Sequence, residues 1–224
     1  MTFSIAARCE ETGQFGIALS SSSIAVGARC PWLLVGVGAV SSQNITLPKL
    51  GQQVLEKLEQ GMKPTSALEQ VLLNDPFSDY RQVIVIDRLG ETAVFSGDKS
   101  LGTYHQVLGK NCVAAGNMLA DKKVINAMVS AFENATGQLA DRLMAALQAA
   151  IEQGGEAGAV HSAALKVVGE YSWPIVDLRV DWAEKDPINE LAGLWQAYEP
   201  QMQAYVTRAI DPREAPSYGV PGDE

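Results

Sequence analysis

QVIVID at residues 82–87 carries apolar side chains at four consecutive positions, from Val83 to Ile86. The turn residues Arg88-Leu89-Gly90 follow, and a second extended run occupies residues 91–95, so the two runs predict an antiparallel hairpin. A strand that is apolar on both faces needs cover on both sides. The stretch therefore predicts a sheet that lies between two other layers of the fold.

The chain around this stretch also predicts strands in antiparallel groups. Residues 2–9 alternate, with Phe3 and Ile5 on one face and Thr2 and Ser4 on the other, which is typical of a strand. A turn at residues 11–13 makes this strand the first arm of a hairpin. Further strands are predicted at residues 14–22, 33–41, near 105–115, 162–168 and 175–180.

Helical spacing of apolar residues predicts pairs of helices between the strand groups, at about 50–58, 65–72, 121–132 and 139–151. One more helix is predicted to begin at Asp186-Pro187 and another at Pro200. The order βββ-αα-βββ-αα-ββ-αα predicts an α+β protein, a four-layer αββα sandwich of two mainly antiparallel sheets. We expect residues 1–210 to form one domain and the proline-rich tail at 211–224 to be flexible or to wrap a partner.

Composition and charge exclude several classes of function. The net charge is −9 and no cluster of lysine or arginine occurs, which argues against nucleic-acid binding. The apolar stretch at 32–40 is too short to cross a membrane, and the first residues have no signal-peptide pattern. We therefore expect a cytoplasmic protein.

The cysteines and the phosphate-loop patterns give no sign of a metal or cofactor. Cys9, Cys30 and Cys112 are odd in number and widely spaced, which argues against disulfides and against a CxxC metal site. Neither GxxxxGK[ST] nor a strand followed by GxGxxG occurs. We expect no metal and no cofactor, and a small molecule as the ligand.

Six stretches of the sequence resemble a bacterial family known as domain of unknown function 1028. They are MTFSI at 1–5, SSSS at 20–23, GVGAV at 36–40, AGNML at 115–119, HSAAL at 161–165 and DLRVD at 177–181. The family is classed with the Ntn-hydrolase-like proteins, and the resemblance extends over almost the whole chain. It implies an αββα fold and the hydrolysis of amide or related C–N bonds.

In the superfamily that the resemblance points to, a Thr, Ser or Cys becomes the first residue of the mature chain. Here that residue would be Thr2, once Met1 is removed. Its amine, with a reference pKa of about 7.7–8.0, would accept the proton of the Thr2 hydroxyl. The alternative is an ordinary threonine in a strand. Proteasome-type members also use a lysine on the early strands, whereas this sequence has no lysine before Lys49, and we transfer that role to neither Arg8 nor Arg29.

Other polar residues are candidates for the same site. Gly116-Asn117 follows a strand, and its backbone N–H groups and the Asn117 amide are candidates to stabilise an oxyanion, unless they form only a turn. Candidate substrate-binding residues are Ser20, Ser22, Gln43, Asn44 and His161. The alternatives are serines that satisfy one another and turn residues at 43–44.

The leading hypothesis is a cofactor-independent amidohydrolase that acts on a small polar amide, lactam or short peptide-like substrate. One alternative is a catalytically silent Ntn-like module for binding or assembly, because fold does not establish function. Another is a Ser/His hydrolase that uses His161. The four tryptophans and the proline-rich tail favour a homo-oligomer, most simply a dimer.

Overall fold

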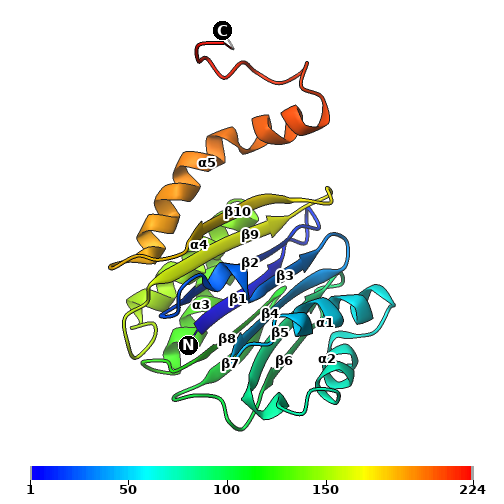
Figure 1. Ribbon diagram of the computed structural model, residues 1–224, viewed down its shortest axis with the longest axis vertical. Coiled ribbons are helices and arrows are strands. Elements are labelled where there is room, and N and C mark those ends of the chain that lie inside the picture. Colours follow the sequence, from blue (N-terminus) through cyan, green and yellow to red (C-terminus); the bar gives the residue numbers. More distant parts are fainter. Residues whose placement is uncertain (1, 223–224) are drawn as a thin grey trace.

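The computed structural model describes residues 2–222, which form two antiparallel sheets that pack face to face with helices outside them (Figure 1). The larger sheet has six strands in the order β10-β9-β2-β1-β8-β7. The bounds of its strands in this order are Pro174–Val180, Ser162–Val168, Phe15–Ser21, Thr2–Arg8, Cys112–Asn117 and His105–Gly109. Strand β1, the first of the chain, therefore lies inside the sheet between β2 and β8.

The smaller sheet has four strands in the order β3-β4-β5-β6. Their bounds are Pro31–Leu34, Gly38–Asn44, Arg81–Asp87 and Thr92–Ser96. On β5, Val83 and Val85 face helices, while Ile84 and Ile86 face the larger sheet. The expectation that this strand is covered on both sides is confirmed.

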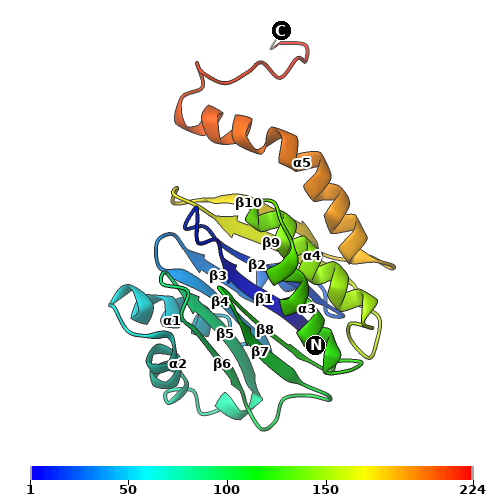
Figure 2. The same cartoon turned by 180° about the vertical axis from the view of Figure 1, so that it is seen from behind.

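Helices α1 (Lys49–Glu59) and α2 (Pro64–Leu72) cover the outer face of the smaller sheet. Helices α3 (Lys123–Asn134) and α4 (Leu139–Glu152) cover the outer face of the larger sheet (Figure 2). This arrangement is the four-layer αββα sandwich that the sequence predicts.

Strand alternation distributes the side chains of β1 between two cores. Phe3 and Ile5 are fully buried against α3 and α4, whereas Ala6 lies between the sheets with Ile17 of β2 and Ile84 of β5. Thr2 and Ser4 share the face of Ala6. The head of β1 thus directs hydroxyl groups into the space between the two sheets.

Three predicted elements differ in the structure. The single strand expected at 33–41 is the hairpin β3–β4, whose turn contains Gly36 with φ at 70°. The strand expected near 105–115 is the hairpin β7–β8, which turns at Asn111 with φ at 56°. The two last helices expected at 187 and 200 are one helix, α5 (Pro187–Ile210), with Pro200 inside it.

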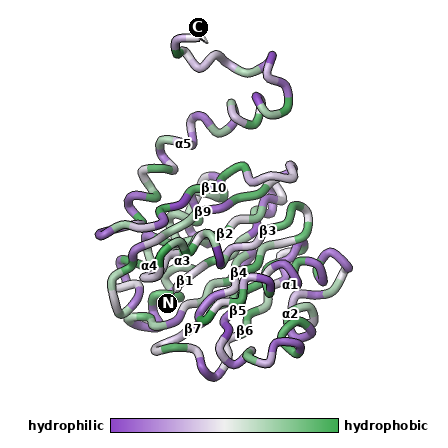
Figure 3. The backbone as a smooth tube through the Cα atoms, in the orientation of Figure 1, coloured by the Kyte–Doolittle hydropathy of each residue, from purple (hydrophilic) through white to green (hydrophobic). Residues whose placement is uncertain are grey.

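Helix α5 packs on the larger sheet as far as Val206, bends along its length, and its C-terminal end and the tail extend away from the sandwich (Figures 1 and 2). Asp186 caps its N-terminus by accepting a hydrogen bond from the Asn189 backbone N–H at 3.1 Å. Purple and green segments alternate along α5 (Figure 3), as expected for a helix that is apolar on one side only. None of the helices in the described chain is both long and apolar enough to span a membrane.

Candidate active site

Thr2 lies at the head of β1, opposite Asn117 of β8 and beside Ser21 of β2. Its side chain faces the smaller sheet, and the residue is only 4% exposed. Its Oγ1 donates a hydrogen bond to Ser21 Oγ over 3.4 Å. The long distance describes a weak contact between two hydroxyl groups in a buried polar environment.

A buried network of side-chain amides, here called the amide ladder, crosses between the sheets next to Thr2. Its members are Ser4, Gln43, Gln82 and Asn117. Ser4 Oγ donates to Gln43 Oε1 at 2.6 Å, and Gln43 Nε2 donates to Gln82 Oε1 at 2.8 Å. Asn117 Nδ2 donates to the same Gln82 oxygen at 3.0 Å. All four residues have no exposed surface, so the ladder is part of the interior.

Two backbone carbonyls fix the orientation of the ladder. Gln43 Nε2 also donates to the Ala115 carbonyl, and Gln82 Nε2 donates to the Gly116 carbonyl, both at 3.1 Å. A carbonyl can accept but cannot donate, so each glutamine must turn its nitrogen to its carbonyl. The oxygen of Gln82 then faces Asn117, which must offer its nitrogen.

Asn117 consequently points its amide oxygen away from the ladder. This Oδ1 atom is buried and accepts no hydrogen bond. Because buried polar atoms are nearly always hydrogen-bonded, such an acceptor indicates a place for a donor that arrives from elsewhere. Asn117 thus presents an acceptor at the residue that pairs with Thr2.

Glu156 is a second buried acceptor at the same end of the sheet. Its backbone pairs with Leu119, and its Oε1 accepts a hydrogen bond from the Ser22 backbone N–H at 3.1 Å. The residue is 4% exposed, and Oε2 is buried without a hydrogen bond. Burial raises the pKa of the Glu156 carboxyl, although hydrogen bonding to Ser22 and the charge of His161 act against it.

His161 stands just before β9, at the border of this region. Its backbone N–H donates to the Ser21 carbonyl at 2.8 Å, and its Nδ1 lies 2.8 Å from the Ala183 carbonyl. A carbonyl partner requires that Nδ1 carry the proton. The ring stacks on Trp182 with 4.4 Å between centroids. The hydroxyl of neighbouring Ser162 donates instead to the Ser23 carbonyl at 2.6 Å.

The four consecutive serines at 20–23 form hydrogen bonds with different partners. Ser20 pairs with Phe3 on the helix side of the sheet and donates from its hydroxyl to the Ser162 carbonyl at 2.9 Å. Ser21, the next residue, shares the face of Thr2 and accepts from the Ser23 backbone N–H at 3.0 Å. Ser22 follows the end of β2 and meets Glu156. The serine hydroxyl beside the Thr2 hydroxyl is therefore that of Ser21.

Asn44 lies apart from the cluster, in the left-handed region with φ at 68°. Its side chain donates to the Tyr80 carbonyl at 2.6 Å and accepts from the Leu101 backbone N–H at 3.2 Å. The structure thus brings together Thr2, Asn117 and Gln43, with Ser22 and His161 at the border. Ser20 faces the helices, and Asn44 connects loops.

The backbone N–H groups after Asn117 are engaged. Met118 donates to the Leu101 carbonyl and Leu119 to the Thr103 carbonyl, each at 2.8 Å. Neither N–H is therefore available to an oxyanion in this conformation. Within residues 2–222, no group of three or more His, Cys, Asp or Glu side chains is placed to hold a metal ion.

Four members of the site were not among the sequence candidates: Ser4, Ser21, Gln82 and Glu156. Gln82 carries a usable signal, because it is a polar residue at the end of a strand face that is otherwise apolar, whereas Ser4 lies on a face that also carries Thr2 and Arg8. Ser21 lies between two candidates, and only the register of β1 with β2 selects it. Glu156 is in a loop after α4, where local sequence gives no sign of burial.

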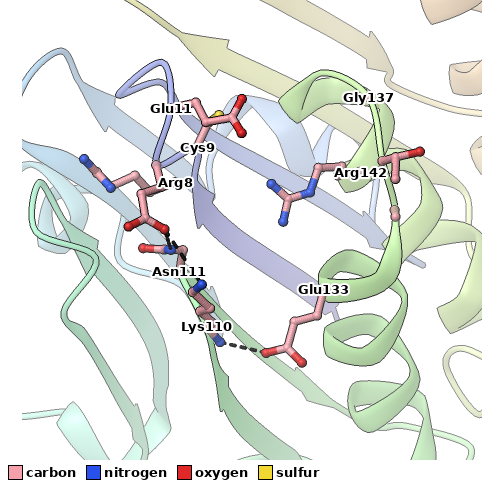
Figure 4. A pocket seen from close by; sticks show the side chains of 11 residues that line it. Arg8, Cys9, Glu11, Lys110, Asn111, Glu133, Gly137 and Arg142 are labelled. Atoms are coloured by element: carbon pink, nitrogen blue, oxygen red, sulfur yellow. Dashed lines mark hydrogen bonds and ion pairs between the residues drawn. The ribbon is translucent and has the colours of Figure 1, made fainter.

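A separate hollow of about 900 Å³ lies at the other end of β1 (Figure 4). Figure 4 shows Arg142 and Glu133 on one side of it, with Arg8 and Cys9 opposite. Burial raises the pKa of the Cys9 thiol, but hydrogen bonds from Thr12 outweigh burial and leave it below its ordinary value. The lining combines Arg8, Lys110 and Arg142 with Glu10, Glu11 and Glu133, so its formal charges balance.

Comparison with solved structures finds a close relative. The crystal structure of protein SPO2555 from Silicibacter pomeroyi, which belongs to DUF1028, is 34% identical in sequence, and the match covers 88% of each chain with a TM-score of 0.83.

Two solved structures of Anbu are much more distant, each with 9% identity over 90% of this chain. They are Anbu (ancestral beta-subunit) from Yersinia bercovieri, with 96% of its chain covered and a TM-score of 0.42, and Anbu from Hyphomicrobium sp. strain MC1, with 97% and 0.43. No curated protein matches this chain.

The family comparison covers most of the chain. The model of the "Family of unknown function (DUF1028)" matches residues 2–191, which include β1 to β10 and the whole amide ladder. The 34% identity to a solved member agrees with this match. The chain belongs to the DUF1028 family.

Proposed function

We propose that this protein is an N-terminal-nucleophile amidohydrolase in which Thr2, freed by removal of Met1, attacks a small polar amide, lactam or short peptide-like substrate. One observation carries the proposal. Thr2 heads a central strand and turns its hydroxyl towards Ser21 Oγ at 3.4 Å, next to the unpaired acceptor Asn117 Oδ1. The first residue of the mature chain would thus lie at a built polar site.

The reaction uses one residue as both nucleophile and base. Thr2 Oγ1 forms a bond to the substrate carbonyl carbon while its proton moves to the Thr2 amine. The resulting ammonium gives that proton to the leaving nitrogen as the C–N bond breaks, which leaves an ester on Thr2. Water then attacks the ester, again with the amine as base, and the acid product leaves with Thr2 restored.

The surrounding residues take supporting roles in this proposal. Ser21 Oγ, beside the nucleophile, donates to the oxyanion of the tetrahedral intermediate. Asn117 Oδ1 accepts an N–H of the substrate, and the amide ladder keeps that oxygen in place. Such fixed dipoles favour the transition state because they need no reorientation during the reaction.

The cysteines are poor competitors for the role of nucleophile. Burial raises the pKa of the Cys30 thiol to about 11 and that of the Cys112 thiol to about 12. At neutral pH both remain thiols, and the thiolate is the reactive form. Reduced, buried cysteines also suit the cytoplasmic location that forms part of this proposal.

The test compares Thr2→Ala with Thr2→Ser. The wild-type protein should release p-nitroaniline from at least one member of a panel of acyl p-nitroanilides, and Thr2→Ala should lower kcat at least about 10³-fold, because the nucleophile is lost. Thr2→Ser keeps a hydroxyl and should retain a measurable rate. Circular dichroism and thermal unfolding establish that both variants fold.

A Thr2→Ala variant that remains as active as the wild-type protein contradicts the proposal. His161→Ala provides a matched comparison for a Ser/His mechanism. Because the hydroxyl of the neighbouring Ser162 donates to the Ser23 carbonyl and not to the His161 ring, we expect that variant to keep most of its activity.

A second candidate, a catalytically silent module for binding, is favoured by the 4% exposure of Thr2. Hydrolysis requires that the surroundings of Thr2 open to admit a substrate. The binding module requires no such opening. If a protein with a free Thr2 amine neither cleaves the panel nor reacts with a small β-lactone, the binding module is the correct function.

A further inference from the structure

Glu156 is a carboxylate that neither the fold nor the reaction described above explains. It is 4% exposed, and one of its two oxygens has no hydrogen bond. An unpaired buried carboxylate is costly, because burial removes its hydration without a compensating partner. The position of such a group therefore indicates from which donor it accepts a hydrogen bond.

The strand pairing places Glu156 across the head of β1. Thr2 lies between Ser21 of β2 and Asn117 of β8, so the next positions outward along these two strands are Ser22 and Met118. Glu156 and the residue after it contact the chain at both of these positions.

On one side, Glu156 Oε1 accepts from the Ser22 backbone N–H at 3.1 Å. On the other, its backbone pairs with Leu119, and the next residue, Ala157, donates its N–H to the Met118 carbonyl at 2.8 Å. Glu156 thus connects the ends of β2 and β8, the two strands on either side of the N-terminal end of β1.

We infer that Glu156 is the counter-ion of the free Thr2 amine: its Oε2 accepts a hydrogen bond from the ammonium form and orients the amine beside the Thr2 hydroxyl. This rests on the proposed function, since the amine exists only when Met1 is removed. Glu156 is then a positioning residue, which acts on catalysis through the amine. The sequence has no lysine before Lys49, so no lysine of the early strands performs this orientation.

A Thr2 ammonium group supplies the donor that Glu156 Oε2 lacks. An ammonium has three N–H donors and satisfies a carboxylate with a charge-assisted hydrogen bond. His161 is the titratable side chain whose charge acts on Glu156 within the described part of the chain, and its ring nitrogen Nδ1 is directed to the Ala183 carbonyl. Ser22 and Leu119, which face Glu156 from the strand ends, carry no charge.

The test measures the amine directly, with no substrate needed. Full-length protein whose mass shows a free Thr2 amine is pulsed with cyanate, which carbamylates only unprotonated amines. The modified N-terminal peptide is then quantified by mass spectrometry. Near pH 6, Glu156→Gln should react about tenfold faster than wild type, because loss of an adjacent carboxylate favours the neutral amine. Glu156→Asp keeps the charge and should react nearly as slowly as wild type.

Glu152→Gln is the matched control, because it removes the same charge from an exposed position at the end of α4. It should react at the wild-type rate. Should Glu156→Gln fail to fold, the wild-type protein is compared with a peptide of residues 2–9. A counter-ion requires that the carbamylation rate of the protein rise at a higher pH than that of the peptide.

Equal carbamylation rates for wild type and Glu156→Gln overturn this inference. So do equal pH midpoints of carbamylation for the protein and the peptide. If Thr2→Ala is inactive at the same time, the proposed function stands without it. Retention of Met1 in the purified protein overturns both.

Discussion

At the scale of single residues, Gln82 joins the two sheets most directly. It accepts from Gln43 and Asn117 and donates to Ser96 Oγ at 2.9 Å and to the Gly116 carbonyl. Every one of these contacts replaces a bond to water, so the net stabilisation from making them is modest. Their loss is costly, because the partners remain buried.

Gln82→Leu should lower the free energy of unfolding by about 2–4 kcal/mol, since at least two buried polar partners lose their bonds. Urea denaturation at pH 7 measures this. Gln70→Leu, on the exposed side of α2, is the control and should change stability by less than about 0.5 kcal/mol. An equal effect of the two substitutions would contradict the role of the amide ladder.

At the scale of elements, a buried ion pair fixes the entry into β5. Arg81 Nε donates to Asp75 Oδ2 at 2.7 Å, and both residues are 7% exposed. Arg81 also donates to the Ile45 carbonyl at 2.6 Å, which ties the end of β4 to the same point. The hydrogen bond from Arg81 holds the pKa of the Asp75 carboxyl below its ordinary value, although burial acts in the opposite direction.

Asp75→Asn should lower the free energy of unfolding by about 3–5 kcal/mol at pH 7, because it leaves the Arg81 charge buried without its partner. The folded-state pKa of Asp75 is depressed, so its stabilisation is present above about pH 4 and is lost as the pH falls through the folded-state value. The difference in free energy of unfolding between Asp75→Asn and the wild-type protein should therefore be smaller at pH 3 than at pH 7. Denaturation at both pH values checks this, with exposed Asp98→Asn as the control; a pH-independent difference would contradict it.

Much of the layer order was predictable from the sequence, but the turns inside two strands were not. The apolar faces of β5 predict a buried sheet directly. The β3–β4 turn, in contrast, consists of Val35-Gly36-Val37, which has none of the Asn or Asp residues that mark tight turns. Pro200 predicts a break, yet α5 continues through it, because a proline removes one helical hydrogen bond and bends a helix without always ending it.

The candidate site was predictable where it lies on strands. Thr2, Asn117 and Gln43 end strands whose alternation directs them inwards. Glu156 was not predictable, because only the long-range pairing with Leu119 and the contact to Ser22 bring a loop residue to the head of β1. The choice of Ser21 over Ser20 likewise depends on the register between β1 and β2.

At the scale of the whole molecule, the C-terminal end of α5 and the tail extend away from the sandwich (Figures 1 and 2). The helix buries Ile188, Leu191, Trp195 and Val206, whereas Tyr205 and Ile210 are 41% and 56% exposed. Exposed apolar side chains that lie together on a surface can form an interface. We propose that a second copy of this chain covers them.

Light scattering coupled to size exclusion should give a mass twice that of the 23.9 kDa chain at micromolar concentration. Replacing Tyr205 and Ile210 together by Glu should produce a monomer with an unchanged circular dichroism signal from the sandwich, because charges are poorly accommodated in an apolar interface. A wild-type monomer at roughly 50 µM, a concentration at which a dimer with a micromolar Kd is mostly associated, would contradict this proposal.

The most direct test of the central claim is the intact mass of the purified protein after incubation with a small β-lactone. Ring opening by Thr2 Oγ1 would break the lactone C–O bond and add the whole mass of the reagent. We predict a chain that lacks Met1 and carries one adduct on the peptide that begins at Thr2, and no adduct on that peptide in Thr2→Ala. A chain that retains Met1, or a free Thr2 that stays unmodified, would contradict it.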